Sequence, residues 1–125
     1  NKKLRLSGLG TLMDGIFLSE ELGVEKPNIE FFEKTFSSIG QVDPRETIII
    51  GDSLSSDIRG GNNAGILTCW YNPSGKEAPE NLRIDYGICT RCLICCKKKR
   101  IQNSLHSMRK YATINKDYIF TLFTG

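Results

Sequence analysis

The sequence predicts an α/β fold built on a parallel sheet, and three features of the chain carry this prediction. The apolar, β-branched run Thr47–Ile50 has the pattern of a strand buried on both faces. A stretch of helical periodicity, Asn28–Ile39, comes before it, and a second strand-like apolar run follows at Ile66–Tyr71. Strands that alternate with helices in this way form parallel sheets.

Two further elements are expected before the Thr47–Ile50 run. Gly15–Ser19 is predicted to be a strand of the same sheet. The helix at Asn28–Ile39 should turn one apolar face to the sheet and end at Gly40. The residues expected on that face are Ile29, Phe32, Phe36 and Ile39.

A helix is also expected at Asp57–Ala64, after the central strand. Gly60 and Gly61 weaken this helix, but their missing side chains would allow a close approach to the sheet. An exposed loop at Asn72–Pro79 and a last short strand at Ile84–Ile88 complete the expected order.

Polar residues gather directly after the Thr47–Ile50 strand, in the segment GDSLSSDIRGG. Open α/β sheets place their ligands just beyond the carboxyl ends of their strands. The carboxylates of Asp52 and Asp57 at such an edge suit a hard cation, and Mg²⁺ is usually held by one or two carboxylates with waters and substrate phosphate. The alternative is an acidic, serine-rich turn that caps the next helix.

Lys26 comes just before the predicted helix at Asn28–Ile39, and Pro27 suits the first position of a helix. A lysine at a helix N-terminus stands where phosphate is already favoured. The alternative is an ordinary solvated surface lysine. A lysine before a helix, followed by a strand and Gly-Asp-x₄-Asp, is a combination that favours the phosphate interpretation.

Residues 7–36 and 47–75, with this combination, resemble the haloacid-dehalogenase-like hydrolases, phosphatases that use an aspartyl-phosphate intermediate. GDSLSSDIRGGNNAGI followed by TCWYNP is similar, more narrowly, to the bacterial pyrimidine 5′-nucleotidase branch. The resemblance covers about residues 1–88. It implies the C-terminal part of a Rossmann-like, three-layer α/β/α parallel-sheet hydrolase core, with the cap domain absent.

The resemblance also implies roles for individual residues. Lys26 matches the lysine that neutralises the phosphoryl group, and Asp52 matches the acidic residue that ligates Mg²⁺. Asp57 matches a second acidic position at the metal, which orients a metal-bound water or Asp52. Ser53 is expected either to donate to a phosphate oxygen or to shape the loop, and the loop role is favoured. The implied cofactor is Mg²⁺, and the implied substrate is a small phosphate ester such as a nucleoside monophosphate.

The nucleophile that the family carries in an Asp-x-Asp-x-Thr/Val motif has no match in this sequence. We therefore expect a fragment of a Mg²⁺-dependent nucleotide phosphatase that is inactive by itself. In such a fragment the strand at Gly15–Ser19 would lack a neighbour. The alternative is a non-catalytic product, either a truncated relic or a small binding module with a cationic, cysteine-rich tail.

The composition changes near residue 88. Residues 1–88 hold nine Lys/Arg and thirteen Asp/Glu, whereas residues 89–125 hold eight Lys/Arg and one Asp/Glu. The second segment also contains four of the five cysteines. The first interpretation of the cysteine-rich segment is a metal or iron–sulfur site. An iron–sulfur run would need a fourth cysteine at position 99, which is Lys, and a zinc site would need a second histidine beside His106. A basic patch for nucleic acid or an anionic membrane is the second interpretation.

The third and favoured interpretation is a reading-frame error or a damaged gene. The predicted domains are thus a partial hydrolase core at 1–88 and an aberrant basic tail at 89–125, disordered or weakly helical. We expect no nucleic-acid and no membrane partner. Five cysteines without a secretory segment predict a cytoplasmic protein. The oligomeric state is not predicted.

Overall fold

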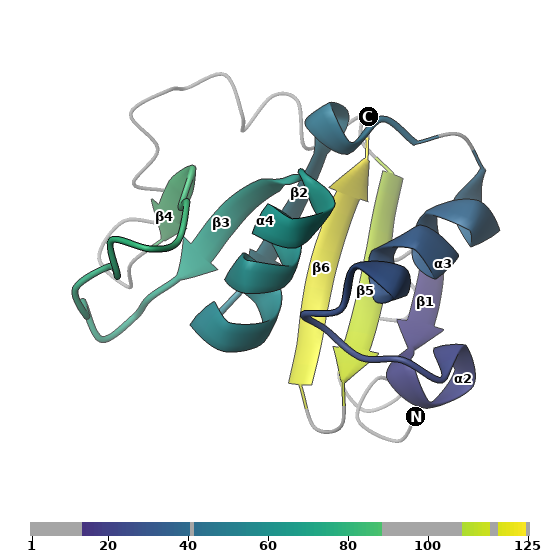
Figure 1. The fold of residues 1–125 in the computed structure, drawn as a ribbon, viewed down its shortest axis with the longest axis horizontal. Helices are drawn as coiled ribbons and strands as arrows, with labels where there is room; N and C mark the ends of the chain where they lie inside the picture. Colours follow the sequence, from purple (N-terminus) through teal and green to yellow (C-terminus); the bar gives the residue numbers. More distant parts are fainter. Residues whose placement is uncertain (1–13, 41, 89–108, 116–117, 125) are drawn as a thin grey trace.

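A computed structural model describes residues 14–40, 42–88, 109–115 and 118–124, and Figure 1 shows their arrangement. The described strands form a mixed sheet in the order β1-β5-β6-β2-β3-β4. Their bounds are Gly15–Leu18 for β1, Thr47–Gly51 for β2, Leu67–Tyr71 for β3, Tyr86–Ile88 for β4, Arg109–Asn115 for β5 and Tyr118–Thr124 for β6. β6 is antiparallel to both neighbours, and the other pairings are parallel. The predicted α/β class is confirmed.

The helices are α2 (Ser19–Leu22), α3 (Ile29–Ile39) and α4 (Arg59–Ala64), with short turns η2 (Pro44–Glu46) and η3 (Leu54–Ile58) on either side of β2. In Figure 1 all three helices lie on the same face of the sheet. The described residues therefore supply two layers, a sheet and the helices that cover one of its faces. In the same part of the chain, no helix is long and apolar enough to cross a membrane.

Helix α3 begins with a capping residue, because the Asn28 side chain accepts a hydrogen bond from the Glu30 backbone N–H at 3.0 Å. Pro27 therefore precedes the cap and does not take the first helical position that the sequence predicted. The apolar face is also turned relative to the prediction. Phe31 is fully buried, whereas Ile29 is 46% exposed. Ile29 lies about 110° around the helix from the centre of the buried face, which passes between Phe31 and Phe32.

The core lies between α3, α4 and the middle of the sheet. Its fully covered members are Phe31, Phe32, Ile49 and Ile66. The predicted close approach at the two glycines of α4 is confirmed. A Cβ at Gly61 would come within 2.6 Å of Thr68 Cγ2, and one at Gly60 within 2.9 Å of Phe32 Cε2.

The helix predicted at Asp57–Ala64 starts differently in the structure. A π-helical turn, η3, runs directly into α4. The backbone N–H groups of Asp57 and Ile58 both donate to the Ser53 carbonyl, at 2.9 and 3.1 Å. The wider turn keeps residue 57 inside a loop that folds back on the end of β2, so the α-helix begins two residues later than predicted.

The region predicted to be disordered or weakly helical contains two strands, so the prediction does not hold for residues 109–115 and 118–124. β5 pairs with β1 from Gly15↔Tyr111 to Leu18↔Ile114, and β6 pairs with β2. β1 was expected to lack a neighbouring strand, and this prediction is wrong because β5 pairs with it. The segments RKYATIN and YIFTLFT are rich in β-branched and aromatic residues, which favour strands. The cysteine cluster at 89–96 lies outside the described residues, so its interpretation stays a prediction.

Candidate functional site

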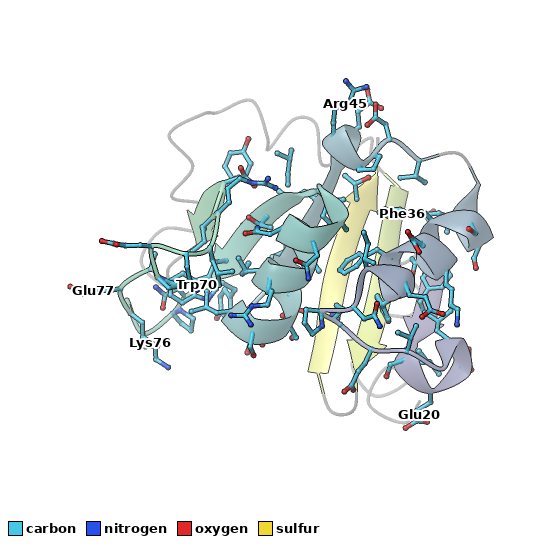
Figure 2. All side chains as sticks on the ribbon, viewed as in Figure 1. Glu20, Phe36, Arg45, Trp70, Lys76 and Glu77 are labelled. Atoms are coloured by element: carbon cyan, nitrogen blue, oxygen red, sulfur yellow. The ribbon has the colours of Figure 1, made fainter. Side chains whose placement is uncertain are left out.

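The candidate site lies at the carboxyl end of β2, where Gly51 is followed by Asp52 and Ser53. A Cβ at Gly51 would fall on the Asp57 carboxylate, so only glycine lets that side chain approach the end of the strand. Asp52 is exposed. Its backbone carbonyl accepts a hydrogen bond from the Trp70 indole Nε1–H, at 3.1 Å, from the end of the neighbouring strand β3. Figure 2 shows Trp70 at this end of the sheet.

Lys26 and Asp57 form a buried ion pair. The Lys26 Nζ lies 2.8 Å from Asp57 Oδ1, and both side chains are fully covered. The ammonium also lies 5.7 Å from the centre of the Phe31 ring. The interpretation of Lys26 as a solvated surface lysine is therefore wrong. The fold brings together two of the predicted site residues that stand 31 positions apart in the chain.

Both carboxylate oxygens of Asp57 have hydrogen-bond donors. Oδ1 accepts from Lys26, and Oδ2 accepts from the Ser53 backbone N–H at 3.1 Å. Burial raises the pKa of Asp57, and the positive charge of Lys26 opposes that rise. Burial lowers the pKa of Lys26, and the charge of Asp57 opposes it. Asp57 thus joins the segment before α3 to the loop after β2.

Asp52 is close enough to this pair to act on it electrostatically. Its negative charge is among the smaller causes that raise the pKa of both Lys26 and Asp57. The three predicted charged residues therefore share one electrostatic environment at the end of β2. Two of them are covered, and the third faces solvent.

Ser53 caps the turn that follows it. Its Oγ accepts a hydrogen bond from the Ser56 backbone N–H at 3.2 Å and lies 3.4 Å from the Ser55 Oγ. π-helical turns of the η3 kind occur often at functional sites. The hydroxyl is engaged within the loop, and its contact with a phosphate stays a prediction.

The donor set fits one part of a magnesium site. Mg²⁺ in proteins commonly takes one or two carboxylates and completes its shell with water and substrate phosphate. The exposed carboxylate of Asp52 suits this role, whereas both oxygens of Asp57 already have donors. Within residues 14–40 and 42–87, no group of three or more His, Cys, Asp or Glu side chains could hold a metal.

Trp70 is a site residue that the sequence analysis did not single out. It was placed on a strand and within the segment TCWYNP, with no role of its own, yet its indole N–H donates a hydrogen bond to the backbone carbonyl of Asp52. The position of Trp70 could have been predicted from the order of the strands, because the carboxyl ends of adjacent parallel strands meet at one edge of the sheet. The last residues of the Ile66–Tyr71 run had to lie beside the Gly51-Asp52 turn.

Residues 24–88 match the family model of the HAD-hydrolase-like proteins, and the chain belongs to this family. The matched region contains Lys26, Asp52, Ser53 and Asp57. The predicted membership in the haloacid-dehalogenase-like superfamily is thus confirmed.

Several relatives are known. The chain is 40% identical over 100 residues to the pyrimidine 5′-nucleotidase PynA of Streptococcus pneumoniae, a match that covers 79% of this chain and 42% of PynA. It is 40% identical over 80 residues to the pyrimidine 5′-nucleotidase YjjG of Escherichia coli, covering 64% of this chain and 36% of YjjG. The chain therefore spans about two fifths of the length of these relatives.

Two solved structures are similar in fold. YfnB of Bacillus subtilis, described as a HAD-hydrolase bound to magnesium, gives a TM-score of 0.67 at 45% identity, over 70% of this chain and 38% of that one. A HAD phosphatase from Thermococcus onnurineus gives 0.62 at 34% identity, over 69% of this chain and 39% of that one. About 70% of this chain therefore shares its fold with known members of the family.

Proposed function

We propose that residues 14–88 are part of a Mg²⁺-dependent phosphatase that hydrolyses small phosphate esters. The observation that carries the proposal is the buried Lys26–Asp57 pair, held at 2.8 Å beside the exposed carboxylate of Asp52. Phosphoryl transfer depends mainly on positioning and on the neutralisation of oxygen charge. A fixed lysine next to an open carboxylate at a strand end supplies the elements of such a site.

Each residue has a distinct role in the proposal. Asp52 would hold Mg²⁺, which when bound supplies positive charge next to the phosphoryl oxygens. Lys26 provides a second positive charge that is fixed before the ligand arrives. Asp57 keeps the ammonium in place and, through the Ser53 N–H, holds the loop that carries Asp52.

The full burial of Lys26 limits how it can act. Its side chain is completely covered in this structure, so contact with a phosphoryl oxygen requires the cover to open. Without that opening, its charge acts on a ligand at Asp52 through space. Either way, its removal should weaken the binding of phosphate more than the binding of Mg²⁺ alone.

We further propose that the substrate is a nucleoside monophosphate and that the reaction passes through an aspartyl-phosphate. Support comes from the relatives named pyrimidine 5′-nucleotidases. Other relatives are named glyceraldehyde 3-phosphate phosphatase and phosphoserine phosphatase, and a small phosphate ester is common to all of these names. None of the aspartates of the sequence lies in an Asp-x-Asp motif. The 125-residue chain is therefore proposed to bind phosphate without turning a substrate over.

The binding test uses this chain, titrated calorimetrically with inorganic phosphate in the presence and absence of Mg²⁺. We expect binding that depends on Mg²⁺ and is lost in Asp52→Asn. The matched control is Asp43→Asn, which changes a carboxylate at the opposite end of β2 and should leave binding intact. Equal loss in both variants, or binding that ignores Mg²⁺, would refute the assignment of Asp52.

The turnover test measures phosphate released from uridine monophosphate with Mg²⁺. We expect no release above the rate without protein. Release that disappears in Asp52→Asn would show that the chain contains its own nucleophile, contrary to the proposal.

The remaining parts of the proposal concern partners and location. We propose a small-molecule partner, with neither nucleic acid nor membrane, and a cytoplasmic protein. The described cysteine, Cys69, is buried on β3, and a cysteine in the core is compatible with a reducing compartment.

A further inference from the structure

A pocket of about 390 Å³ opens beside the candidate site, between the η3 turn and the loop that follows β3. Asp52 and Ser55 line it from the side of β2, and Trp70, Tyr71, Ser74 and Lys76 line it from β3 and its loop. Figure 2 shows Trp70 and Lys76 at the same end of the sheet. Its volume lies near the lower end of the range of small-molecule sites, roughly 300–1,000 Å³.

The loop that forms one wall of the pocket is braced by Asn72. The Asn72 Nδ2 donates to the Lys76 carbonyl at 2.8 Å, and its Oδ1 accepts from the Lys76 backbone N–H at 3.0 Å. The Gly75 backbone N–H also donates to the Asn72 carbonyl, at 3.2 Å. Gly75 has a φ of 64°, which favours glycine. The wall is therefore preformed, which reduces the entropy cost of binding.

The opposite side of the pocket is joined to the candidate metal ligand. Trp70 is 6% exposed, and its indole N–H is bonded to the Asp52 carbonyl at 3.1 Å. A group that contacts the Trp70 side of the pocket thus lies next to whatever Asp52 holds. Pocket and candidate phosphate site share a residue and a hydrogen bond.

The lining specifies the chemistry of the occupant. Trp70 and Tyr71 offer aromatic surface, against which a planar ring packs well. The ammonium of Lys76 can only donate hydrogen bonds, and the Ser74 hydroxyl can donate one. An occupant that satisfies both features is flat and carries acceptor oxygens.

We infer that this pocket is the subsite for the organic group of the phosphate ester, and that it selects a planar ring bearing carbonyl acceptors. The inference rests on the proposed function, since it assigns the pocket relative to a phosphate at Asp52. In this inference Lys76 discriminates between substrates by donating hydrogen bonds to the ring. Asn72 holds the backbone of Lys76 in position.

The test uses the single tryptophan of the sequence, Trp70, whose fluorescence responds to a ligand in this pocket. Uridine is titrated into the 125-residue chain without Mg²⁺ or phosphate. We expect a saturable change in emission with uridine and none with ribose. Lys76→Ala should weaken uridine binding at least threefold, whereas Lys34→Ala, which changes an exposed lysine on α3, should not alter it.

A second titration links the pocket to the candidate phosphate site. Uridine monophosphate with Mg²⁺ should bind at least tenfold tighter than uridine, because one molecule engages both sites. No response to uridine, an equal response to ribose, or an unchanged affinity in Lys76→Ala would overturn the subsite. The unliganded emission spectrum and thermal unfolding of each variant verify that it is folded.

The two proposals fail in different ways. Mg²⁺-dependent binding of inorganic phosphate without uridine binding overturns the subsite and leaves the proposed function standing. Uridine binding without any binding of phosphate overturns the proposed function and, with it, the assignment of the pocket to a phosphate ester.

Discussion

Lys26 and Asp57 show how a single contact can organise a site. Taking either charge out of water alone costs several kcal/mol, and the cost is tolerable only because the partner lies 2.8 Å away. A buried pair of this kind is weak evidence for stability, since an apolar pair of similar size is often as stable. Its position beside Asp52 is better explained by the need for a fixed positive charge there.

Removal of one partner should therefore destabilise the protein strongly. Lys26→Met keeps the length of the side chain but leaves the Asp57 carboxylate covered and unpaired, which should cost about 3–5 kcal/mol in the free energy of unfolding. Urea unfolding measures this. The double variant Lys26→Met/Asp57→Leu should lose clearly less than the two single variants together, because no buried charge remains.

The control for this prediction is the exposed ion pair of Glu30 and Lys34 on α3, with 3.0 Å between the charged atoms. Lys34→Ala should cost no more than about 1 kcal/mol, since exposed pairs contribute little. Similar losses in Lys26→Met and Lys34→Ala would contradict the burial of the first pair.

Asp43 offers a test of pH dependence away from the site. Hydrogen bonds from the Arg45 side chain, at 2.8 and 3.1 Å, and from its backbone N–H hold the pKa of Asp43 below its usual value. A lowered pKa in the folded state stabilises that state above the usual pKa of aspartate, and this contribution is lost as the pH falls through the lowered pKa. The carboxyl titration of Asp43 by NMR should show the low midpoint, and Arg45→Ala should return it towards the usual value. An unchanged midpoint in that variant would exclude Arg45 as the cause.

At the scale of elements, the packing of α4 on the sheet depends on two glycines. Gly61→Ala would place a methyl group 2.6 Å from Thr68 Cγ2 and 2.8 Å from Ile49 Cγ2, and neither buried, β-branched side chain can turn away freely. Overpacking of this kind typically costs about 1–3 kcal/mol. Alanine also favours the helix by up to about 1 kcal/mol over glycine, so we expect a net loss of stability.

The matched control is Gly87→Ala on β4, where an added Cβ meets nothing within 4 Å. Thermal unfolding should show a lower Tm for Gly61→Ala and almost no change for Gly87→Ala. A higher Tm for Gly61→Ala would mean that helix propensity outweighs the contact with the sheet.

The sequence predicted the helices and strands that local patterns mark. It did not predict the contacts between residues that lie far apart in the chain. The structure has β1, α3, β2 and β3 within one residue of their predicted positions, because apolar runs and helical periodicity mark them. The Lys26–Asp57 contact could not be derived, because it depends on how the crossover through α3 returns to β2. The exposure of Ile29 had the same origin, since the packing of α3 against the sheet decides which of its apolar residues are covered.

At the scale of the whole molecule, β5 and β6 decide how the sheet is connected. They lie between β1 and β2, so β1 reaches the rest of the sheet through them (Figure 1). On the helical side, α3 and α4 also join the two halves through the contact of Gly60 with Phe32. The sequence analysis predicted a disordered or weakly helical tail here. The residue types of β5 and β6 favour strands, but they do not show that β5 pairs with β1, which lies far away in the sequence.

Deletion of residues 109–125 should therefore lower the stability of the chain, whereas an aberrant, disordered tail could be removed without loss. The deletion leaves the backbone N–H and C=O groups of β1 without strand partners and frees one edge of β2. Urea unfolding should show a lower midpoint, and the β1 amides should exchange with solvent faster. Thr121→Pro tests the same point in the full chain, because β6 pairs on both sides and proline removes a donor from the middle of that strand. Equal stability of the deleted, substituted and original chains would show that β5 and β6 contribute nothing, and that residues 14–88 fold without them.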